Sequence, residues 1–121
     1  MLQDMPKVGG GAGGSEYSID TGEFTFPSSG TYTLVLPHKP KFLRITGILS
    51  TSACVDRVLD DTSKMNTTPV SYTAYTSNTG STWSGYGSSN TGMTWDGDKT
   101  VTLARVTSAE GGVTYKYFMY Y

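Results

Sequence analysis

GEFTFPSSGTYTLVLPHKPKFLRITGIL, residues 22–49, is the stretch from which the fold can be predicted. Apolar side chains recur at every second position in three short runs, which Pro-Ser-Ser-Gly and Pro-His-Lys-Pro separate. This period is that of a β-strand with one buried face, and Pro, Gly and Ser are typical of turns. We therefore predict three strands, the first two joined by a tight hairpin turn at residues 27–30. Their core-facing residues are Phe24 and Phe26, then Tyr32, Leu34 and Leu36, then Leu43, Ile45, Gly47 and Leu49.

The same period of two continues toward the C-terminus. VSYTAYT at 70–76, KTVTLARVT at 99–107 and GVTYKYFMYY at 112–121 alternate in the same way and are rich in Thr and Tyr. Asp96-Gly97-Asp98 predicts a hairpin turn. Short strands at this spacing predict an all-β fold, an antiparallel, jelly-roll-like β-sandwich. We expect Trp95, Tyr115 and Tyr117 to lie in its core.

One segment, SACVDRVLDDTSK at residues 52–64, leaves two interpretations open. Val55, Val58 and Leu59 stand at positions i, i+3 and i+4, which is the spacing of one face of a helix. A short helix near residues 53–63 is therefore one prediction, and a further strand is the other.

Residues 1–15 read MLQDMPKVGGGAGGS. A row of small residues forms no packed element and costs backbone entropy to order, so we predict a flexible Gly-rich N-terminal arm at 1–15 and a β-sandwich domain at 16–121. The match of this arm to G-x-G-x-x-G is not a dinucleotide site, because no strand precedes it and no helix follows it. The side chains that can anchor the arm are Leu2, Met5, Pro6 and Val8, and we predict that another subunit holds them.

The composition argues against several classes of function. The net charge is −1 and charged residues make up 16% of the 121 residues, so the basic excess of a nucleic-acid-binding protein is lacking. One histidine, His38, and one cysteine, Cys54, cannot assemble a metal cluster or a hydrolytic triad. No run approaches the roughly 18 apolar residues of a membrane span. We predict no metal, no cofactor, no nucleic-acid partner, no membrane insertion and no enzymatic activity.

A different composition marks residues 76–92, TSNTGSTWSGYGSSNTG. Small polar residues surround Trp83 and Tyr86, and Tyr75 directly precedes the segment. We predict a long loop that exposes these aromatic side chains, because long loops in compact domains are often functional. Aromatic rings on such a loop suit a sugar or a receptor, so a carbohydrate- or receptor-binding module is an alternative function for the chain.

The sequence resembles a known group of proteins at both ends of the domain. GEFTFPSSGTYTLVLPHKPKFLRI is similar to the start of small bacteriophage virion structural proteins, which begin with a G-x-F-T-V-P hairpin and continue to a G-F-K-P-K-x-V strand. TGMTWDGDKTVTLARVTSAEGGVTYKYFMYY resembles their closing G-F-T-W hairpin and final V-T-Y-x-Y strand. The resemblance covers residues 22–48 and 91–121, about half of the chain. This sequence has Leu36-Pro37-His38 where the family usually has Gly-Phe before Lys-Pro.

The resemblance implies a virion component, made in the host cytoplasm: a tail, baseplate, fibre or capsid-attached β-sandwich protein. It also implies that the partners are copies of the same chain and other virion proteins, with a trimer as the favoured homo-oligomer. A host surface glycan is the partner that the alternative function would require. A charge-poor domain rich in Thr, Ser, Gly and Tyr is compatible with a permanent assembly, in which neighbouring copies cover strand edges.

Overall fold

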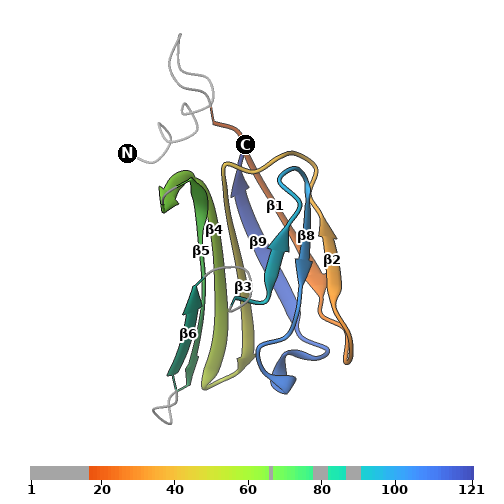
Figure 1. Cartoon of the computed structure of the whole chain (residues 1–121). Helices are drawn as coiled ribbons and strands as arrows, with labels where there is room; N and C mark the ends of the chain where they lie inside the picture. The colour runs from red at the N-terminus through yellow and green to blue at the C-terminus, as the bar shows by residue number, and fades with distance from the viewer. Residues whose placement is uncertain (1–16, 66, 78–81, 87–90) are drawn as a thin grey trace, which may run out of the picture.

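The computed structural model describes residues 17–121 except 66, 78–81 and 87–90. The predicted arm at 1–15 therefore lies outside the described residues, together with its anchors Leu2, Met5, Pro6 and Val8. The described chain is built of strands and one short 3-10 helix (Figure 1). In chain order they are β1 (Ile19–Thr25), β2 (Tyr32–Val35), β3 (Phe42–Ser50), β4 (Ala53–Met65), β5 (Thr68–Ser77), β6 (Thr82–Tyr86), β7 (Met93–Trp95), β8 (Thr100–Leu103), η2 (Ser108–Glu110) and β9 (Thr114–Tyr120).

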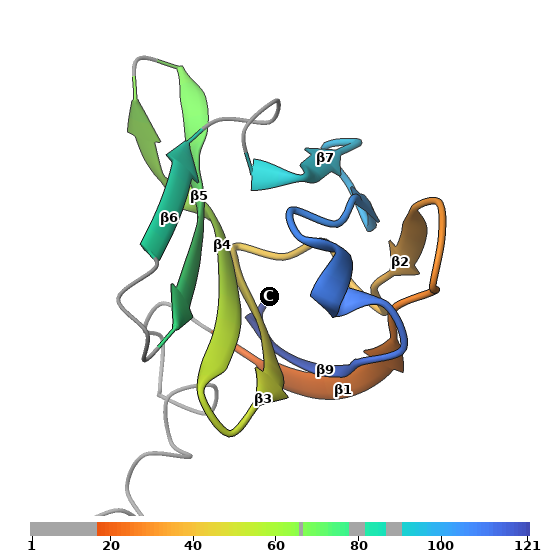
Figure 2. The ribbon, with the colours of Figure 1, turned by 90° about the horizontal axis from the view of Figure 1, so that it is seen from below.

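These strands form two sheets, in which all pairings are antiparallel. The large sheet has the strand order β1-β9-β3-β4-β5-β6, and the small sheet has the order β2-β8-β7. Seen from below, the large sheet curves from β6 round to β1, and β2 and β7 lie on its concave side (Figure 2). The predicted all-β, two-sheet architecture is confirmed.

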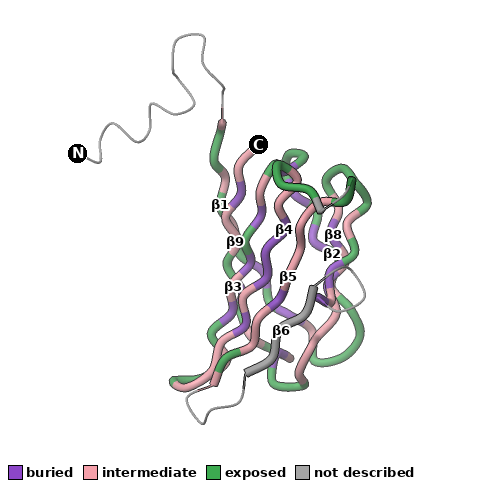
Figure 3. The backbone as a smooth tube through the Cα atoms, turned by 60° about the vertical axis from the view of Figure 1, so that its left-hand side comes forward, coloured by how far each residue is buried: buried purple, intermediate pink, exposed green. Residues whose placement is uncertain are grey.

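The core lies between the two sheets and consists of alternate residues of both. Along β3 the buried residues Leu43, Ile45 and Gly47 recur at every second position, as the period of two predicts (Figure 3). Tyr115 is fully buried, and Tyr117 and Trp95 pack against the buried cluster, so the three predicted core aromatics are confirmed. The buried apolar residues are Phe24, Phe26, Leu34, Leu36, Leu43, Ile45, Val55, Leu59, Met93, Val101, Leu103, Tyr115 and Met119.

The hairpin predicted at residues 27–30 is wrong. β1 and β2 lie in different sheets, so this turn carries the chain from one sheet to the other. The pairing of β1 with the β9 side of the sheet continues one residue beyond β1. The Phe26 amide donates to the Val113 carbonyl at 2.9 Å, and the Phe26 carbonyl accepts from the Gly112 amide at 2.8 Å. The two runs therefore present their apolar faces to one core from opposite sides, instead of side by side in one sheet.

The helix considered near residues 53–63 is also wrong, because this segment is part of strand β4. β4 pairs with β3 on one side and with β5 on the other. As a strand it directs Val55, Arg57 and Leu59 toward the core, and all three are buried. A helix would leave the adjacent edges of β3 and β5 without their hydrogen-bond partners, and such groups are costly to leave unpaired.

The hairpin predicted at Asp96-Gly97-Asp98 is confirmed, since it joins the paired strands β7 and β8. Gly97 has φ of +86°, a conformation that favours glycine. The Asp96 carboxylate accepts from the backbone amides of Asp98 at 2.8 Å and Thr100 at 3.1 Å, and these bonds lower the pKa of that carboxyl. The indole of Trp95 donates to the Asp98 carbonyl at 2.8 Å, so the side chain and the turn hold each other in place.

Candidate functional site

The first feature with functional potential is an aromatic cluster on the convex side of the large sheet. Because Tyr115, Tyr117 and Met119 of β9 face the core, Phe118 and Tyr120 face away from it. The ring of Tyr120 lies 5.6 Å from that of Phe42, 5.4 Å from that of Phe118 and 5.4 Å from that of Tyr17, measured between centroids. We call Tyr17, Phe42, Phe118 and Tyr120 the outer aromatic cluster.

A hollow of about 730 Å³ lies beside this cluster, over β1, β9 and β3. This volume is within the range of about 300–1,000 Å³ that is typical of ligand pockets. Phe42 and Phe118 belong to both the cluster and the hollow. We call it the outer hollow, and its lining residues are Thr21, Gly22, Glu23, Phe42, Arg44, Thr46, Lys116, Tyr117 and Phe118.

Charged side chains of both signs surround the aromatic part of the outer hollow. The Arg44 Nε donates to the Asp56 carboxylate at 3.0 Å, and the Thr46 hydroxyl donates to the same oxygen at 3.0 Å. The hydrogen bond and the charge of Asp56 raise the pKa of the Arg44 guanidinium. Lys116 and Glu23 are exposed and stand opposite each other in the ladder. The hollow therefore offers apolar ring surface together with cationic donors and a carboxylate acceptor, which suits binding of an apolar segment that carries charge.

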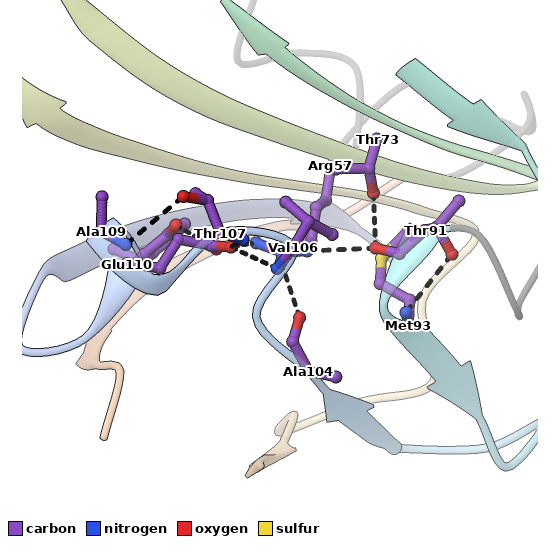
Figure 4. A network of polar contacts seen from close by, with 10 residues as sticks. Arg57, Thr73, Thr91, Met93, Ala104, Val106, Thr107, Ala109 and Glu110 are labelled. Atoms are coloured by element: carbon purple, nitrogen blue, oxygen red, sulfur yellow. Dashed lines mark hydrogen bonds and ion pairs between the residues drawn. The ribbon is translucent and has the colours of Figure 1, made fainter. Parts of the chain in front are cut away.

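The second feature is a polar network inside the core, which connects the two sheets (Figure 4). Arg57 of β4 is fully buried, and each of its nitrogens donates a hydrogen bond. The acceptors are Glu110 Oε1 at 2.8 Å, the Ala104 carbonyl at 2.8 Å and the Thr91 carbonyl at 3.3 Å. Thr91 precedes β7 and Ala104 follows β8, so one side chain of the large sheet binds the end of the small sheet.

Glu110 balances this charge and is itself fully buried. Its Oε2 accepts from the amides of Val106 at 2.6 Å and Thr107 at 3.1 Å, which shapes the connection between β8 and β9. Its Oε1 accepts from Arg57 and from the Tyr115 hydroxyl. Burial, followed by the hydrogen bond and charge of Glu110, raises the pKa of that hydroxyl, so Tyr115 stays protonated as a donor.

A glycine explains why Tyr115 reaches Glu110. Gly47 of β3 stands opposite Tyr115 of β9 in the ladder. A Cβ atom at Gly47 would lie 2.4 Å from carbons of the Tyr115 ring, so the ring occupies the space that any other residue would fill. Because the network is closed to solvent and its charges bind each other, its role is structural: it connects the sheets.

The residues that the sequence singled out for ligand binding lie in the hairpin at one edge of the large sheet. Residues 76–92 were expected to form a loop, but Trp83 and Tyr86 belong to strand β6, which corrects that expectation. Trp83 stands opposite Tyr75 and Tyr86 opposite Tyr72 in the β5–β6 ladder. Tyr75 is half-buried and packs against the core. The side chains of Trp83 and Tyr86 lie outside the described residues.

His38 and Cys54 take structural positions. The imidazole of His38 stacks on the ring of Tyr121, with centroids 3.8 Å apart and planes 8° from parallel. Cys54 is a half-buried free thiol in β4. Among the described residues, no group of three or more His, Cys, Asp or Glu side chains is placed to hold a metal ion. Within the same part of the chain, no helix has the length and apolar character needed to cross a membrane.

Sequence reasoning missed both the outer aromatic cluster and the buried ion pair, although each left a signal. In GVTYKYFMYY aromatic residues occupy both alternating sets, so Phe118 and Tyr120 fall on the face opposite to the predicted core face. Arg57 stands between Val55 and Leu59 at the strand period, which would place it in the core if the segment were read as a strand. Glu110 in SAEGG carried no such signal, because it lies in a connection.

Comparison of the chain with protein-family models, with curated proteins and with solved structures gave no significant match.

Proposed function

We propose that the chain is a non-enzymatic structural protein of a bacteriophage virion, a tail, baseplate, fibre or capsid-attached component. In this proposal it assembles into a homo-oligomer, with a trimer favoured, through its N-terminal arm and the edges of its sheets. The chief support is where the two phage-like segments lie in the fold. Residues 22–48 supply β2 and most of β1 and β3, and residues 91–121 supply β7, β8 and β9.

These six strands make up the whole small sheet and three neighbouring strands, β1-β9-β3, of the large sheet. Segments far apart in sequence thus form one two-layer unit, and β4, β5 and β6 extend it from the β3 edge. If this chain and the phage proteins share one structural module, their similarity should be confined to strands that pack together, as it is here. This arrangement supports the virion assignment as a fold-level analogy.

Exposed apolar residues on edge strands support assembly. Val35 of β2 is 66% exposed and Ile19 of β1 is 52% exposed, and each strand lies at the edge of its sheet. An edge strand presents unpaired amides and carbonyls that can pair with another chain. An apolar side chain beside that row adds area for a neighbouring copy to cover.

Deleting residues 1–14 is expected to leave the sandwich folded and to abolish assembly. Light scattering coupled to gel filtration should show an oligomer for the full chain and a monomer for the deletion variant, with matching circular dichroism spectra and melting temperatures. An equally assembled deletion variant would contradict the proposal. Mass spectrometry of purified phage particles tests the virion assignment directly, and absence of the chain from particles would refute it.

The alternative is a carbohydrate- or receptor-binding module at the β5–β6 hairpin. The observation that favours it is the ladder, which sets Trp83 opposite Tyr75 and Tyr86 opposite Tyr72 at the sheet edge. Trp83→Ala and Tyr86→Ala are then expected to abolish adsorption to host cells or to a glycan array while the melting temperature stays unchanged, since aromatic side chains dominate such contacts. Early unfolding of both variants would mean that these residues stabilise the fold and that this site does not exist.

A further inference from the structure

We propose that the outer hollow of one copy binds residues 2–8 of a neighbouring copy, with Asp4 of that segment against Lys116. This inference rests on the proposed assembly through the arm, and it identifies the surface to which the arm binds. It is carried by three observations: the place where the arm joins the domain, the chemistry of the hollow, and the pattern of residues in the arm.

The described chain begins on the same face as the hollow. Ser18 pairs with Tyr121 by backbone hydrogen bonds in both directions, at 3.0 and 2.9 Å, so the β1 ladder already extends to this residue. Tyr17 packs its ring on Tyr120, and the Lys41 ammonium lies 4.9 Å from the centre of the Tyr17 ring. The described chain therefore begins at the outer aromatic cluster, on the convex side of the large sheet.

The hollow has a chemistry that selects for its occupant. The rings of Phe42 and Phe118 are half-buried and form an apolar surface. Among the described residues Lys116 makes no ion pair, and it is exposed at the hollow. An occupant with apolar side chains and one carboxylate would cover the rings and pair with this ammonium group.

The arm contains such a segment. Leu2, Asp4, Pro6 and Val8 occupy alternate positions, so an extended chain places three apolar residues and one carboxylate on a single face. Met5 belongs to the other face, together with Gln3 and Lys7. An extended segment with alternate anchoring side chains is a recurrent way in which one chain binds a sheet of another.

The sequence between the segment and the domain provides the reach. Residues 9–16, GGGAGGSE, are eight residues and span at most about 29 Å when extended. A connection of this composition permits many backbone paths, so its length and sequence allow the arm to reach an adjacent copy. When each copy inserts its arm into the next, every hollow is filled and the contacts can close into a ring.

Charge reversal in the full chain tests the pairing. Lys116→Glu and Asp4→Lys are each expected to raise the concentration at which half of the chains assemble by about tenfold, because each places like charges together. The double variant is expected to recover most of the assembly, since it restores opposite charges in reversed order. Lys99→Glu is the matched control: it makes the same charge change at an exposed position of the β7–β8 hairpin, and it should leave assembly unchanged.

Two further variants keep the test independent of folding. A glutamate at position 116 would also stand opposite Glu23 in the ladder and repel it, so Lys116→Gln is included as a neutral change. Phe118→Ala removes ring surface from the hollow. Both are expected to weaken assembly while melting temperatures stay close to that of the parent chain. If both assemble normally while deletion of residues 1–14 abolishes assembly, the arm binds elsewhere: the inference fails and the proposed function stands. If the deletion variant assembles normally, the proposed function itself fails.

Cross-linking decides which copy supplies the arm. In a Cys54→Ser background, chains with Asp4→Cys are mixed with chains that carry Lys116→Cys, and we expect a disulfide between the two kinds of chain. A disulfide that forms only when one chain carries both cysteines would place each arm on its own domain and overturn the inference.

Discussion

Replacing Arg57 with alanine is expected to lower the free energy of unfolding by about 3–5 kcal/mol, because it leaves the carboxylate of Glu110 buried without its cation. Both side chains are 0% exposed, so the carboxylate loses its cation at a position away from bulk water. The change also leaves the carbonyls of Thr91 and Ala104 without the Arg57 donor. A domain of this size has a total stability of about 5–15 kcal/mol, so the variant should unfold at a much lower denaturant concentration or fail to fold.

The surface ion pair of Arg44 and Asp56 provides the matched control. It also joins an arginine to a carboxylate, at 3.0 Å, but the Arg44 side chain is 55% exposed. Arg44→Ala is expected to cost less than about 1 kcal/mol, since exposed pairs contribute little. Urea unfolding followed by circular dichroism compares the two variants. Equal losses would contradict a special role for the buried pair.

A second change separates the lost charge from the lost packing. Adding Glu110→Gln to Arg57→Ala removes the uncompensated negative charge while it keeps a side-chain oxygen for the Val106 and Thr107 amides. The double variant should therefore be more stable than Arg57→Ala alone. If the second change lowers stability further, the cost of Arg57→Ala arises from the cavity and from the lost hydrogen bonds to backbone carbonyls, and not from the carboxylate.

Gly47→Ala is expected to lower the free energy of unfolding by about 2–4 kcal/mol, through overpacking and the loss of a buried hydrogen bond. The new Cβ would lie 2.4 Å from carbons of the Tyr115 ring, which is fully buried and bonded to Glu110 at its far end. The ring can move only by breaking that bond. Thermal unfolding and near-ultraviolet circular dichroism would report the loss and the altered tyrosine environment.

Gly22→Ala is the control for this substitution. Its Cβ would lie 2.6 Å from atoms at the outer end of the Tyr117 side chain, which is only half-buried. That ring can swing aside, so the expected loss is about 1 kcal/mol, at the low end for overpacking. If both glycines tolerate alanine equally, the Tyr115–Glu110 bond does not hold its ring in place.

The strand pattern could be predicted because it depends on local chemistry. A strand with one buried face needs apolar side chains at every second position, whichever strand lies beside it. For this reason Phe24, Leu34, Leu43 and Tyr115 could be assigned to the core from their own neighbours in sequence. The β7–β8 hairpin was predicted for the same reason, since Asp96, Gly97 and Asp98 contain all that the turn requires.

Strand partners were not predictable from the same signal. Residues 27–30 form a turn whether β1 and β2 pair in one sheet or lie in two sheets that face each other. The alternating apolar residues fit both arrangements. Residues distant in sequence determine which arrangement forms, because Phe26 pairs with Gly112 and Val113 and this pairing keeps β1 in the large sheet. Likewise Val55, Val58 and Leu59 fit a helix and a strand equally well, and the presence of β3 and β5 on either side selected the strand.

The amino-acid sequence by itself determined that the chain is an all-β protein with a core of alternate apolar residues and with residues 1–15 set apart by their composition. Only the tertiary structure decided that Arg57, Glu110 and Tyr115 meet in the core, and that Phe42, Phe118 and Tyr120 gather with Tyr17 beside a hollow. The physical reason is range. Periodicity is set by adjacent residues. An ion pair between residues 53 positions apart, and a cluster drawn from β3, β9 and the segment before β1, require the sheets to be paired first.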